Sequence, residues 1–375
     1  MIYKCYFSLI FNDISKLITI IQLLRYNCLF LRKNFELIQI KPNAQIYLFC
    51  PSNYATGGPE ALHQLGKRLI ELGHSVFMYY FYHQGDHPVH QSYIKYNVPF
   101  VNEIENQKGN FIILPETFLE PIFNKNYSAI KKIVWWLSVT NYEIVLDNAK
   151  EAVKHKKFYS LKSRFFPNKY KTLPTITNLK LKGVLNLAHS HFSLDFLTRN
   201  EMDIIGKISD YMSDSFYERI DNSTLKEDIL LYNPKKNGEY LDSIMSKSQH
   251  LNWKPLVNMS PDEVAIWMNK SKLYVDFGYH PGQERMPREA ILMKCCVVTG
   301  SKGSAAYQDD VPVPTGFKFD DSKDSAEKVI RRLEQTLANF DEDTKLFKDY
   351  RIRIIAEKAN FNKAVKLVFG GSENN

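Results

Sequence analysis

From about residue 45 onward, apolar positions follow a repeating order. Residues 46–50 form a short apolar run, small residues fill 52–58, and leucines then recur at three- or four-residue spacing over 62–72. This order predicts a strand, a tight turn, and an amphipathic helix that begins at Pro59 and ends at Gly73. Repeated units of strand, loop and helix are typical of a parallel sheet covered by helices.

The same unit recurs in both halves of the chain. Further strands are predicted over 74–80, 111–114, 133–137, 228–232, 273–277 and 295–299, and further helices from residue 239, over 261–267 and over 287–294. Ser260 and Glu263 have the spacing of a capping box, in which each side chain bonds the other residue's amide. Residues 150–180 fit no element. We expect two α/β domains, 41–220 and 221–345, and a closing helix and tail over 346–375.

The N-terminal segment, residues 1–40, has a pattern of its own. Apolar residues recur at three- or four-residue spacing from Phe7 to Leu24, while basic side chains such as Lys16 and Arg25 lie near the polar side. Such a helix either rests in the plane of an anionic membrane or packs its apolar side on the protein. Because Asp13, Lys16 and Arg25 interrupt the apolar run, we expect neither a signal peptide nor a spanning helix.

Composition narrows the classes of partner and compartment. The chain has 375 residues, 44% of them hydrophobic, which suffices for two cores rather than one. A net charge of +8 favours anionic partners, but the charges are interspersed and no nucleic-acid-binding motif is present, so we expect no nucleic acid partner. Five cysteines without a CxxC pair indicate buried thiols in a reducing compartment, the cytoplasm.

Candidate chemistry lies in three loops that follow predicted strands. Ligands bind beyond the carboxyl ends of parallel strands, so residues 56–58, 233–238 and 280–289 are expected to meet at one cleft. Gly57 and Gly58 allow the backbone to approach a ligand closely, and the next helix offers free amides to a phosphate. The simpler interpretation of the two glycines is a plain tight turn.

The second loop carries two adjacent lysines. Lys235 or Lys236 is expected to neutralise a diphosphate leaving group as its charge grows. The alternative is a charged, solvated turn, and the sequence does not distinguish the two lysines.

The third loop concentrates charge between an apolar strand and an apolar helix. If the helix begins at Pro287, Glu289 lies in its first turn, where its carboxylate can accept ribose hydroxyls. Arg285 or Arg288 can pair with phosphate through two hydrogen bonds. The alternative is that Glu289 only complements the helix dipole.

At these residues the chain resembles a known family. Residues 260–299 look like the donor-binding half of GT-B glycosyltransferases, particularly the retaining group (glycosyltransferase family 4) with a Glu-x7-Glu motif followed by alanine. Residues 56–62 resemble the acceptor-side loop of the same group. Glu289, followed by Ala290, matches the second glutamate of the motif, which binds the nucleotide ribose in that group. Pro281 stands where the first glutamate is expected.

The resemblance implies two Rossmann-like parallel-sheet domains that face a central cleft, the first on the acceptor side and the second for the donor. It also implies transfer of a sugar from a nucleotide-diphosphate donor to a saccharide or lipid-linked acceptor, in bacterial surface polysaccharide synthesis, in the cytoplasm or on the inner face of its membrane. Gly303 and Ser304 resemble the family's loop near the donor. We expect no cofactor and no bound metal.

Catalytic candidates are His189, His280 and Glu284. His189 would act on the acceptor, unless it is a surface loop histidine, whereas His280 or Glu284 would replace the missing first glutamate. Two other functions stay open. A nucleotide-sugar epimerase of the same architecture would turn over without an acceptor, and a non-catalytic protein would bind a nucleotide sugar, or a partner glycosyltransferase, and transfer nothing.

Overall fold

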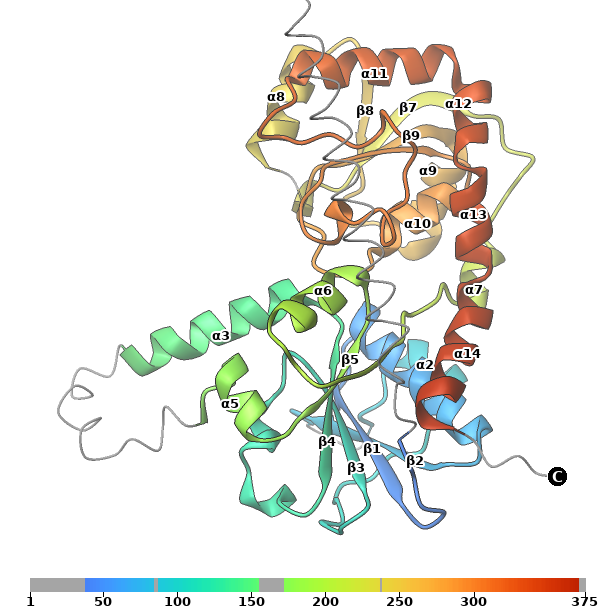
Figure 1. The fold of residues 1–375 in the computed structure, drawn as a ribbon. Coiled ribbons are helices and arrows are strands. Elements are labelled where there is room, and N and C mark those ends of the chain that lie inside the picture. Colours follow the sequence, from blue (N-terminus) through green and yellow to red (C-terminus); the bar gives the residue numbers. More distant parts are fainter. Residues whose placement is uncertain (1–37, 84–86, 155–171, 237, 371–375) are drawn as a thin grey trace, which may run out of the picture. The chain divides into compact units, whose positions relative to one another are not determined.

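The computed structural model describes residues 38–83, 87–154, 172–236 and 238–370 (Figure 1), and residues 38–375 form one compact unit. The predicted amphipathic N-terminal helix and its role at a membrane concern residues outside this description, apart from its last few positions. Within the described residues, no helix combines the length and apolar character needed to cross a lipid bilayer.

Six parallel strands build the first sheet, in the order β2-β1-β3-β4-β5-β6. They are β1 (Gln45–Pro51), β2 (Ser75–Phe81), β3 (Phe111–Pro115), β4 (Lys131–Trp136), β5 (Leu185–Ala188) and β6 (Ile204–Lys207). The first four confirm predicted strands, with ends shifted by one or two residues. The strands β5 and β6, of four residues each, were not predicted, and neither was the four-residue strand at Asn252–Pro255 in the second half.

The helices of this half are α2 (Gly57–Glu71), α3 (Val139–Lys154), α5 (Ile176–Leu181) and α6 (His191–Arg199), with short 3-10 turns η1 (Gln91–Tyr96), η2 (Glu120–Ile122) and η3 (Lys125–Tyr127). The short helix α7 (Asp214–Tyr217) follows β6, and its Phe216 belongs to the core of the second sheet. The buried residues of α2 share a core with Leu48 of β1 and Met78 of β2. On the other face, Trp136 of β4 packs against Tyr142 of α3 and Phe196 of α6. Helices therefore cover both faces of the sheet.

A second, four-stranded parallel sheet has the order β10-β9-β7-β8. Its strands are β7 (Glu227–Tyr232), β8 (Asn252–Pro255), β9 (Ser271–Asp276) and β10 (Cys296–Thr299), with α8 (Glu239–Lys247), α9 (Pro261–Lys270), α10 (Arg285–Leu292) and the turns η5 (Pro234–Lys236) and η6 (Ser304–Ala306). The predicted capping box is present: Ser260 Oγ accepts from the Glu263 amide, and the Glu263 carboxylate accepts from the Ser260 amide at 2.7 Å.

Two predicted helix starts were wrong in the same way. Helices α2 and α10 begin at Gly57 and Arg285, each two residues before the proline that was expected to open it. Pro59 and Pro287 both occupy the third helical position. The first N–H groups of a helix have no partner within it, so a proline there costs no hydrogen bond.

The chain ends in four helices, α11 (Ala326–Ala338), α12 (Phe340–Leu346), α13 (Lys348–Ile355) and α14 (Glu357–Phe369). The last one returns to the first sheet, where it lies beside α2 (Figure 1). Phe361, Val365 and Val368 of α14 belong to the same core as β1 and α2. The first half is therefore completed by the end of the chain.

Candidate active site

A cleft of about 580 Å³ opens where the carboxyl ends of the two sheets meet. Its lining comes from the β1–α2 turn (Thr56, Gly57, Gly58), the loops after β3 and β4 (Glu116, Thr117, Leu137, Ser138), the segments after β5 and β6 (His189, Asp210), Lys236 after β7, and residues 281–286 after β9. The predicted convergence of three loops is confirmed. The loops after β3 and β4 and Asp210 were not anticipated.

The amino end of α2 faces this cleft. Thr56 is the N-cap residue but makes no side-chain capping bond, so the amides of Gly57 and Gly58 are not used by the cap. A Cβ atom at Gly57 would lie 3.5 Å from Nε of Arg285, and one at Gly58 would lie 3.5 Å from Leu137. Larger residues here would narrow the cleft between the helix and Arg285.

Arg285, the first residue of α10, lies against the start of α2. Its Nη1 donates to Glu60 of α2 at 2.5 Å, and its Nη2 lies 3.8 Å from Asp210. The Nε and Nη2 atoms are buried and make no hydrogen bond. Although burial opposes it, Arg285 and Tyr96 hold the pKa of Glu60 below its ordinary value. The guanidinium thus keeps donors that a ligand could use.

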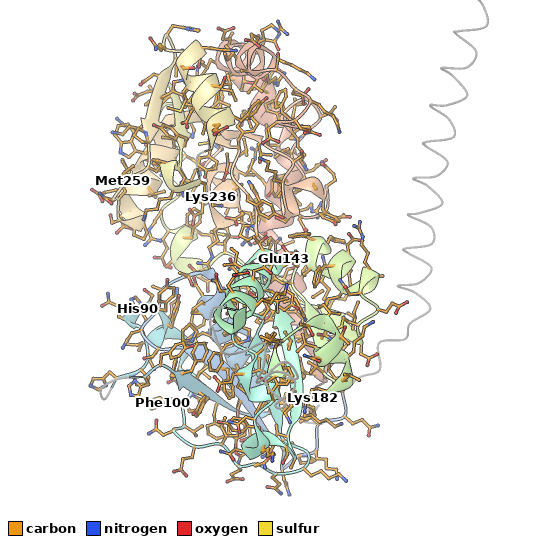
Figure 2. All side chains as sticks on the ribbon, turned by 90° about the vertical axis from the view of Figure 1, so that its left-hand side faces the viewer. His90, Phe100, Glu143, Lys182, Lys236 and Met259 are labelled. Atoms are coloured by element: carbon orange, nitrogen blue, oxygen red, sulfur yellow. The ribbon has the colours of Figure 1, made fainter. Side chains whose placement is uncertain are left out.

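The structure distinguishes the two lysines of the β7 loop. Lys236, which is labelled in Figure 2, lines the cleft, where its ammonium pairs with Glu284 and lies 3.9 Å from Asp276. Lys235 is exposed and does not line the cleft. Glu284 lines the cleft as well, at the N-cap of α10, and its carboxylate is bound to Lys236.

Arg288 and Glu289 lie behind the cleft rather than in its lining. The Arg288 side chain is 1% exposed and donates to Asp210 at 3.0 Å and to Glu357 of α14 at 2.9 Å. Glu289 lies in the second turn of α10, so its predicted place in the first turn was wrong. Burial raises the pKa of Glu289 despite the nearby Arg285 and Arg288.

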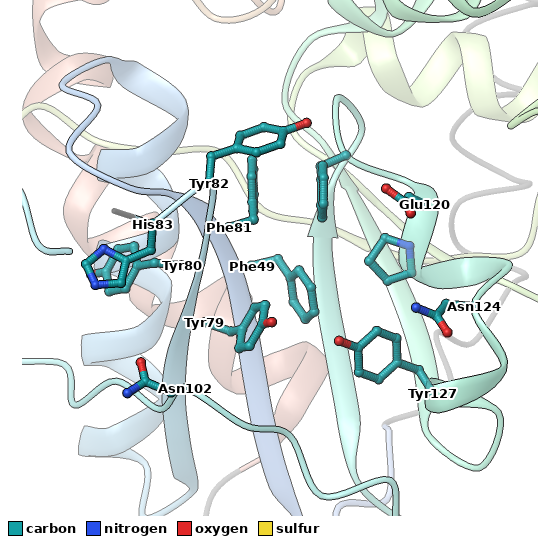
Figure 3. Close-up of a pocket in the computed structure, with 12 residues that line it drawn as sticks. Phe49, Tyr79, Tyr80, Phe81, Tyr82, His83, Asn102, Glu120, Asn124 and Tyr127 are labelled. Carbon is teal, nitrogen blue, oxygen red and sulfur yellow. The ribbon is translucent and has the colours of Figure 1, made fainter. Parts of the chain in front are cut away.

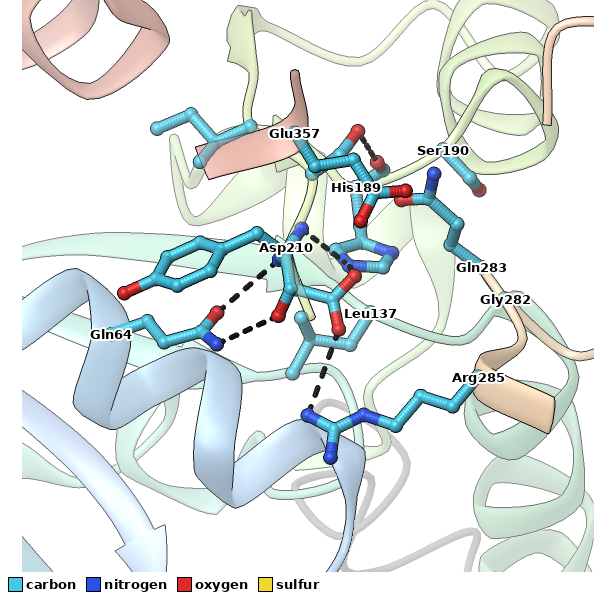
Figure 4. A network of polar contacts seen from close by, with 12 residues as sticks. Gln64, Leu137, His189, Ser190, Asp210, Gly282, Gln283, Arg285 and Glu357 are labelled. Atoms are coloured by element: carbon cyan, nitrogen blue, oxygen red, sulfur yellow. Dashed lines mark hydrogen bonds and ion pairs between the residues drawn. The ribbon is translucent and has the colours of Figure 1, made fainter. Parts of the chain in front are cut away.

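His189 reaches the cleft beside Asp210 (Figure 4). Its Nε2 lies 3.4 Å from Oδ1 of Asp210 and 3.2 Å from the Asp210 backbone nitrogen, whereas its Nδ1 is buried without a hydrogen bond. Burial would raise the pKa of Asp210, but Arg288 and His189 outweigh it and hold that pKa below the ordinary value. A charged carboxylate therefore orients the ring.

The remaining predicted residues support the loop after β9 from behind. His280 is fully buried, with Nε2 3.5 Å from Asp276 and 3.4 Å from Thr299. Gly303 has φ 61°, and a Cβ there would lie 2.1 Å from the His280 carbonyl oxygen. Ser304 donates from Oγ to the Gly282 carbonyl. None of the three lines the cleft.

Glu116 is a cleft residue that the sequence analysis missed. It is buried directly after β3 and accepts a hydrogen bond from the Leu137 amide at 2.8 Å. Burial raises the pKa of its carboxyl to about 8. Its position at the end of an apolar strand was a usable signal, because the same rule selected the three predicted loops.

The expectation of a metal-free site stays a prediction. Among the described residues, no three His, Cys, Asp or Glu side chains are grouped so that they could hold a metal ion. Cys50, Cys295 and Cys296 are free thiols and are buried, as predicted.

No protein-family model matches the sequence, and no curated protein matches it significantly. Solved structures do match the fold. A glycosyltransferase from Rickettsia africae ESF-5 superposes with a TM-score of 0.57 over 88% of this chain and 99% of its own, at 14% identity. Anabaena Alr3699/HepE, solved in complex with UDP-glucose, superposes with a TM-score of 0.54 over 86% of this chain and 98% of its own, at 11% identity. The chain has the GT-B fold.

A third GT-B structure is WaaG, described as a glycosyltransferase involved in lipopolysaccharide biosynthesis. It gives a TM-score of 0.50 over 87% of this chain and all of its own, at 13% identity. At such identities the likeness establishes the fold, and the chemistry of this chain has to be argued from its own cleft.

Proposed function

We propose that this GT-B protein is a glycosyltransferase that moves a sugar from a nucleotide-diphosphate donor to a saccharide or lipid-linked acceptor. The observation that carries the proposal is Arg285, whose buried Nε and Nη2 make no hydrogen bond beside the uncapped amino end of α2, in a cleft between two parallel sheets; Nη2 has only a long ion pair with Asp210, at 3.8 Å. A buried donor that makes no hydrogen bond lowers the stability of the folded protein, and an anionic ligand would supply the missing acceptor.

The proposed leaving group is the nucleoside diphosphate. Its charge grows as the bond to the sugar breaks, and Arg285, Lys236 and the amides of Gly57 and Gly58 supply donors around one part of the cleft. Preorganised donors of this kind stabilise the transition state more than the ground state. Lys236 would exchange part of its contact with Glu284 for a phosphate oxygen.

Contacts to the transferred sugar must differ from the Glu-x7-Glu pattern. Pro281 offers no carboxylate, and the Glu284 carboxylate is bound to Lys236. Gln283 lines the cleft with a buried Oε1 that has no hydrogen bond, so we assign it the role of accepting a sugar hydroxyl. Glu289 is proposed to reach the ribose from behind the loop.

His189 is proposed to bind the incoming hydroxyl of the acceptor. The Asp210 backbone N–H donates to the Nε2 atom of the ring, so a neutral ring carries its proton on Nδ1, which can donate to the oxygen of a hydroxyl in the cleft. A place in bacterial surface polysaccharide synthesis follows from the resemblance of the sequence, and the identity of the acceptor would establish it.

Nucleotide binding tests this proposal most directly. The melting temperature would be measured with UDP, GDP, CDP, dTDP and ADP for the intact protein, Lys236→Ala and the matched control Lys235→Ala. A ligand at 100 times its Kd adds about 2.7 kcal/mol of stability, a shift of several degrees. We expect one diphosphate to stabilise the intact protein and Lys235→Ala equally, and Lys236→Ala clearly less.

Two results would count against the proposal. The first is that no nucleoside diphosphate stabilises the folded protein. The second is that Lys235→Ala loses as much stabilisation as Lys236→Ala, which would mean that general surface charge, and not the cleft, attracts the nucleotide. Once the base is known, release of the diphosphate from a donor sugar, with and without added saccharides, distinguishes a transferase from an epimerase or a non-catalytic binder.

A further inference from the structure

A second cavity, of about 590 Å³, lies on the first sheet and shares no lining residue with the cleft. We call it the aromatic pocket, because its walls are Phe49 of β1, Tyr79 and Phe81 of β2, and Phe118 and Tyr127 of the following loops (Figure 3). Its volume is typical of a site for a small organic ligand.

The pocket lies on the sheet face opposite α2. Side chains alternate along a strand, and Leu48 and Met78 face the core beneath α2. Their neighbours Phe49 and Tyr79, paired across the two strands, therefore face the other way, with ring centroids 4.7 Å apart. Phe81 stacks on Phe118 at 3.9 Å with an angle of 5° between the rings. The result is an aromatic wall in which Phe49 is buried and Tyr79, Phe81 and Phe118 are partly exposed.

The polar groups that line the pocket are tyrosine hydroxyls, the His83 ring, two asparagines and one carboxyl group, that of Glu120. Glu120, Asn102 and Asn124 stand at its edge, and none of the described residues that line it is lysine or arginine. The side chains of Asn102 and Glu120 are exposed and make no hydrogen bond within the described part of the chain. A phosphate or another anion would meet the Glu120 carboxylate here, with no lysine or arginine among the described lining residues to bind it. A neutral ligand with an apolar face and many hydroxyls fits better, and a sugar ring has both features.

Tyr82 adds a second observation at the rim. Its side chain is 79% exposed and contacts Phe81 and Phe118 edge to face, yet its φ is 58°. A bulky residue rarely adopts this left-handed conformation, which glycine adopts without strain. A strained, exposed aromatic ring at the mouth of a pocket is the kind of residue that is kept for binding rather than for folding.

The pocket and the cleft are lined by neighbouring residues of the same two chain segments. Pro51, which ends β1, lines the cleft, and Phe49 lies two residues before it on the same face, roughly 7 Å away along the strand. Thr117 lines the cleft, and the next residue, Phe118, lines the pocket. A chain of sugars with one end in the cleft could therefore extend across the aromatic wall.

We propose that the aromatic pocket binds sugar residues of a neutral oligosaccharide acceptor, beyond the residue that receives the new sugar. The proposal rests on the glycosyltransferase function proposed above and narrows its acceptor to a glycan several sugars long. The ring faces stack on Phe81, Phe118 and Tyr82, while Asn102 and Glu120 bind hydroxyls.

Binding without any nucleotide tests the pocket separately from the donor site. Maltooligosaccharides, cellooligosaccharides, chitooligosaccharides and mannooligosaccharides would be titrated into the intact protein by ligand-observed NMR. The variants are Tyr82→Gly, which removes the ring and relieves the backbone, and Asn102→Ala. Leu181→Ala is the control, because Leu181 is also 79% exposed but lies on α5, away from the pocket.

We expect one glycan series to bind to the intact protein. Its affinity should be roughly tenfold weaker for Tyr82→Gly, because one stacked ring is lost, and unchanged for Leu181→Ala. Asn102→Ala should weaken binding less. Tyr82→Gly should melt no lower than the intact protein and should keep its stabilisation by the nucleoside diphosphate.

The possible failures are distinguishable. If a nucleoside diphosphate stabilises the protein but no oligosaccharide binds, or if binding is the same in Tyr82→Gly, the pocket proposal is wrong and the proposed function stands. If an oligosaccharide binds through Tyr82 but no nucleotide does, the pocket is a saccharide site and the transferase function is wrong. Binding of tetramethylammonium in place of glycans would show an aromatic cage for cations and would also overturn the proposal.

Discussion

Replacing Arg288 should strongly destabilise the protein. Its guanidinium donates to both oxygens of Asp210, at 3.0 and 3.2 Å, and to Glu357 at 2.9 Å, and it also reaches the carbonyl oxygens of Gln283 and Glu284. The side chain is 1% exposed. Arg288→Met keeps much of the volume and removes every one of these donors.

The expected cost follows from what the variant leaves behind. Asp210 would keep only Arg285, at 3.8 Å, and the His189 ring, while Glu357 would keep the Met212 amide. Removing one partner of a buried ion pair costs about 3–5 kcal/mol, because the other charge stays buried without compensation. The pKa of Asp210, now held low by Arg288, should rise in the variant.

Urea-induced unfolding followed by circular dichroism measures this cost. The control is Arg331→Met, because Arg331 is exposed on α11 and the change should stay within about 0.5 kcal/mol. Adding Asp210→Asn and Glu357→Gln to Arg288→Met should restore part of the loss, since both stranded charges are then gone. A cost below about 1 kcal/mol for Arg288→Met, or no recovery in the triple variant, would refute this reasoning.

Three further predictions concern stability. Burial raises the pKa of the Glu116 carboxyl group from 4.5 to about 8, so the protonated group contributes stability fully below pH 4.5, and this contribution is lost as the pH rises towards 8. Between these pH values the melting temperature should therefore fall less steeply for Glu116→Gln than for the intact protein. An equal slope would contradict the raised pKa. Gly282→Ala places a Cβ atom 2.3 Å from the Leu137 carbonyl oxygen, so the variant should have a lower melting temperature and weaker nucleotide binding. In the control Gly238→Ala the new Cβ atom has no neighbour within 4 Å, and nucleotide binding should be normal. Ser260→Ala removes the cap of α9 and should cost about 1 kcal/mol in urea unfolding, while no change would mean that Glu263 caps the helix alone.

Local pattern was sufficient to predict most of the fold. The apolar strand at residues 46–50, the leucine spacing of α2 and the capping box of Ser260 and Glu263 all express interactions within a few residues, and all three are present. The starts of α2 and α10 were misplaced because a proline is equally acceptable at the first or third helical position. Strand β6 was not predicted, because Gly206 interrupts the apolar pattern of its four residues.

The site was harder to predict because its chemistry depends on distant pairings. Arg285, Arg288 and Glu289 all looked available for a ligand, but the sequence does not show that Asp210, 78 positions away, binds Arg288. Likewise, His280 faces Asp276 and Thr299 inside the second half, which its neighbours in sequence do not reveal. Loops that meet at strand ends follow from topology, whereas the partner of each charge follows from the folded structure.

The return of α14 to the first sheet limits how such a chain can exchange parts in evolution or by engineering. Val368 lies directly over β6, where Gly206 has no side chain and a Cβ would be 2.4 Å from its Cγ2 atom. A single recombination point between β6 and β7 would join the first sheet to a foreign last helix that was not shaped for this glycine. Transplanting the second sheet into another GT-B protein therefore needs two junctions, one before β7 and one before α14.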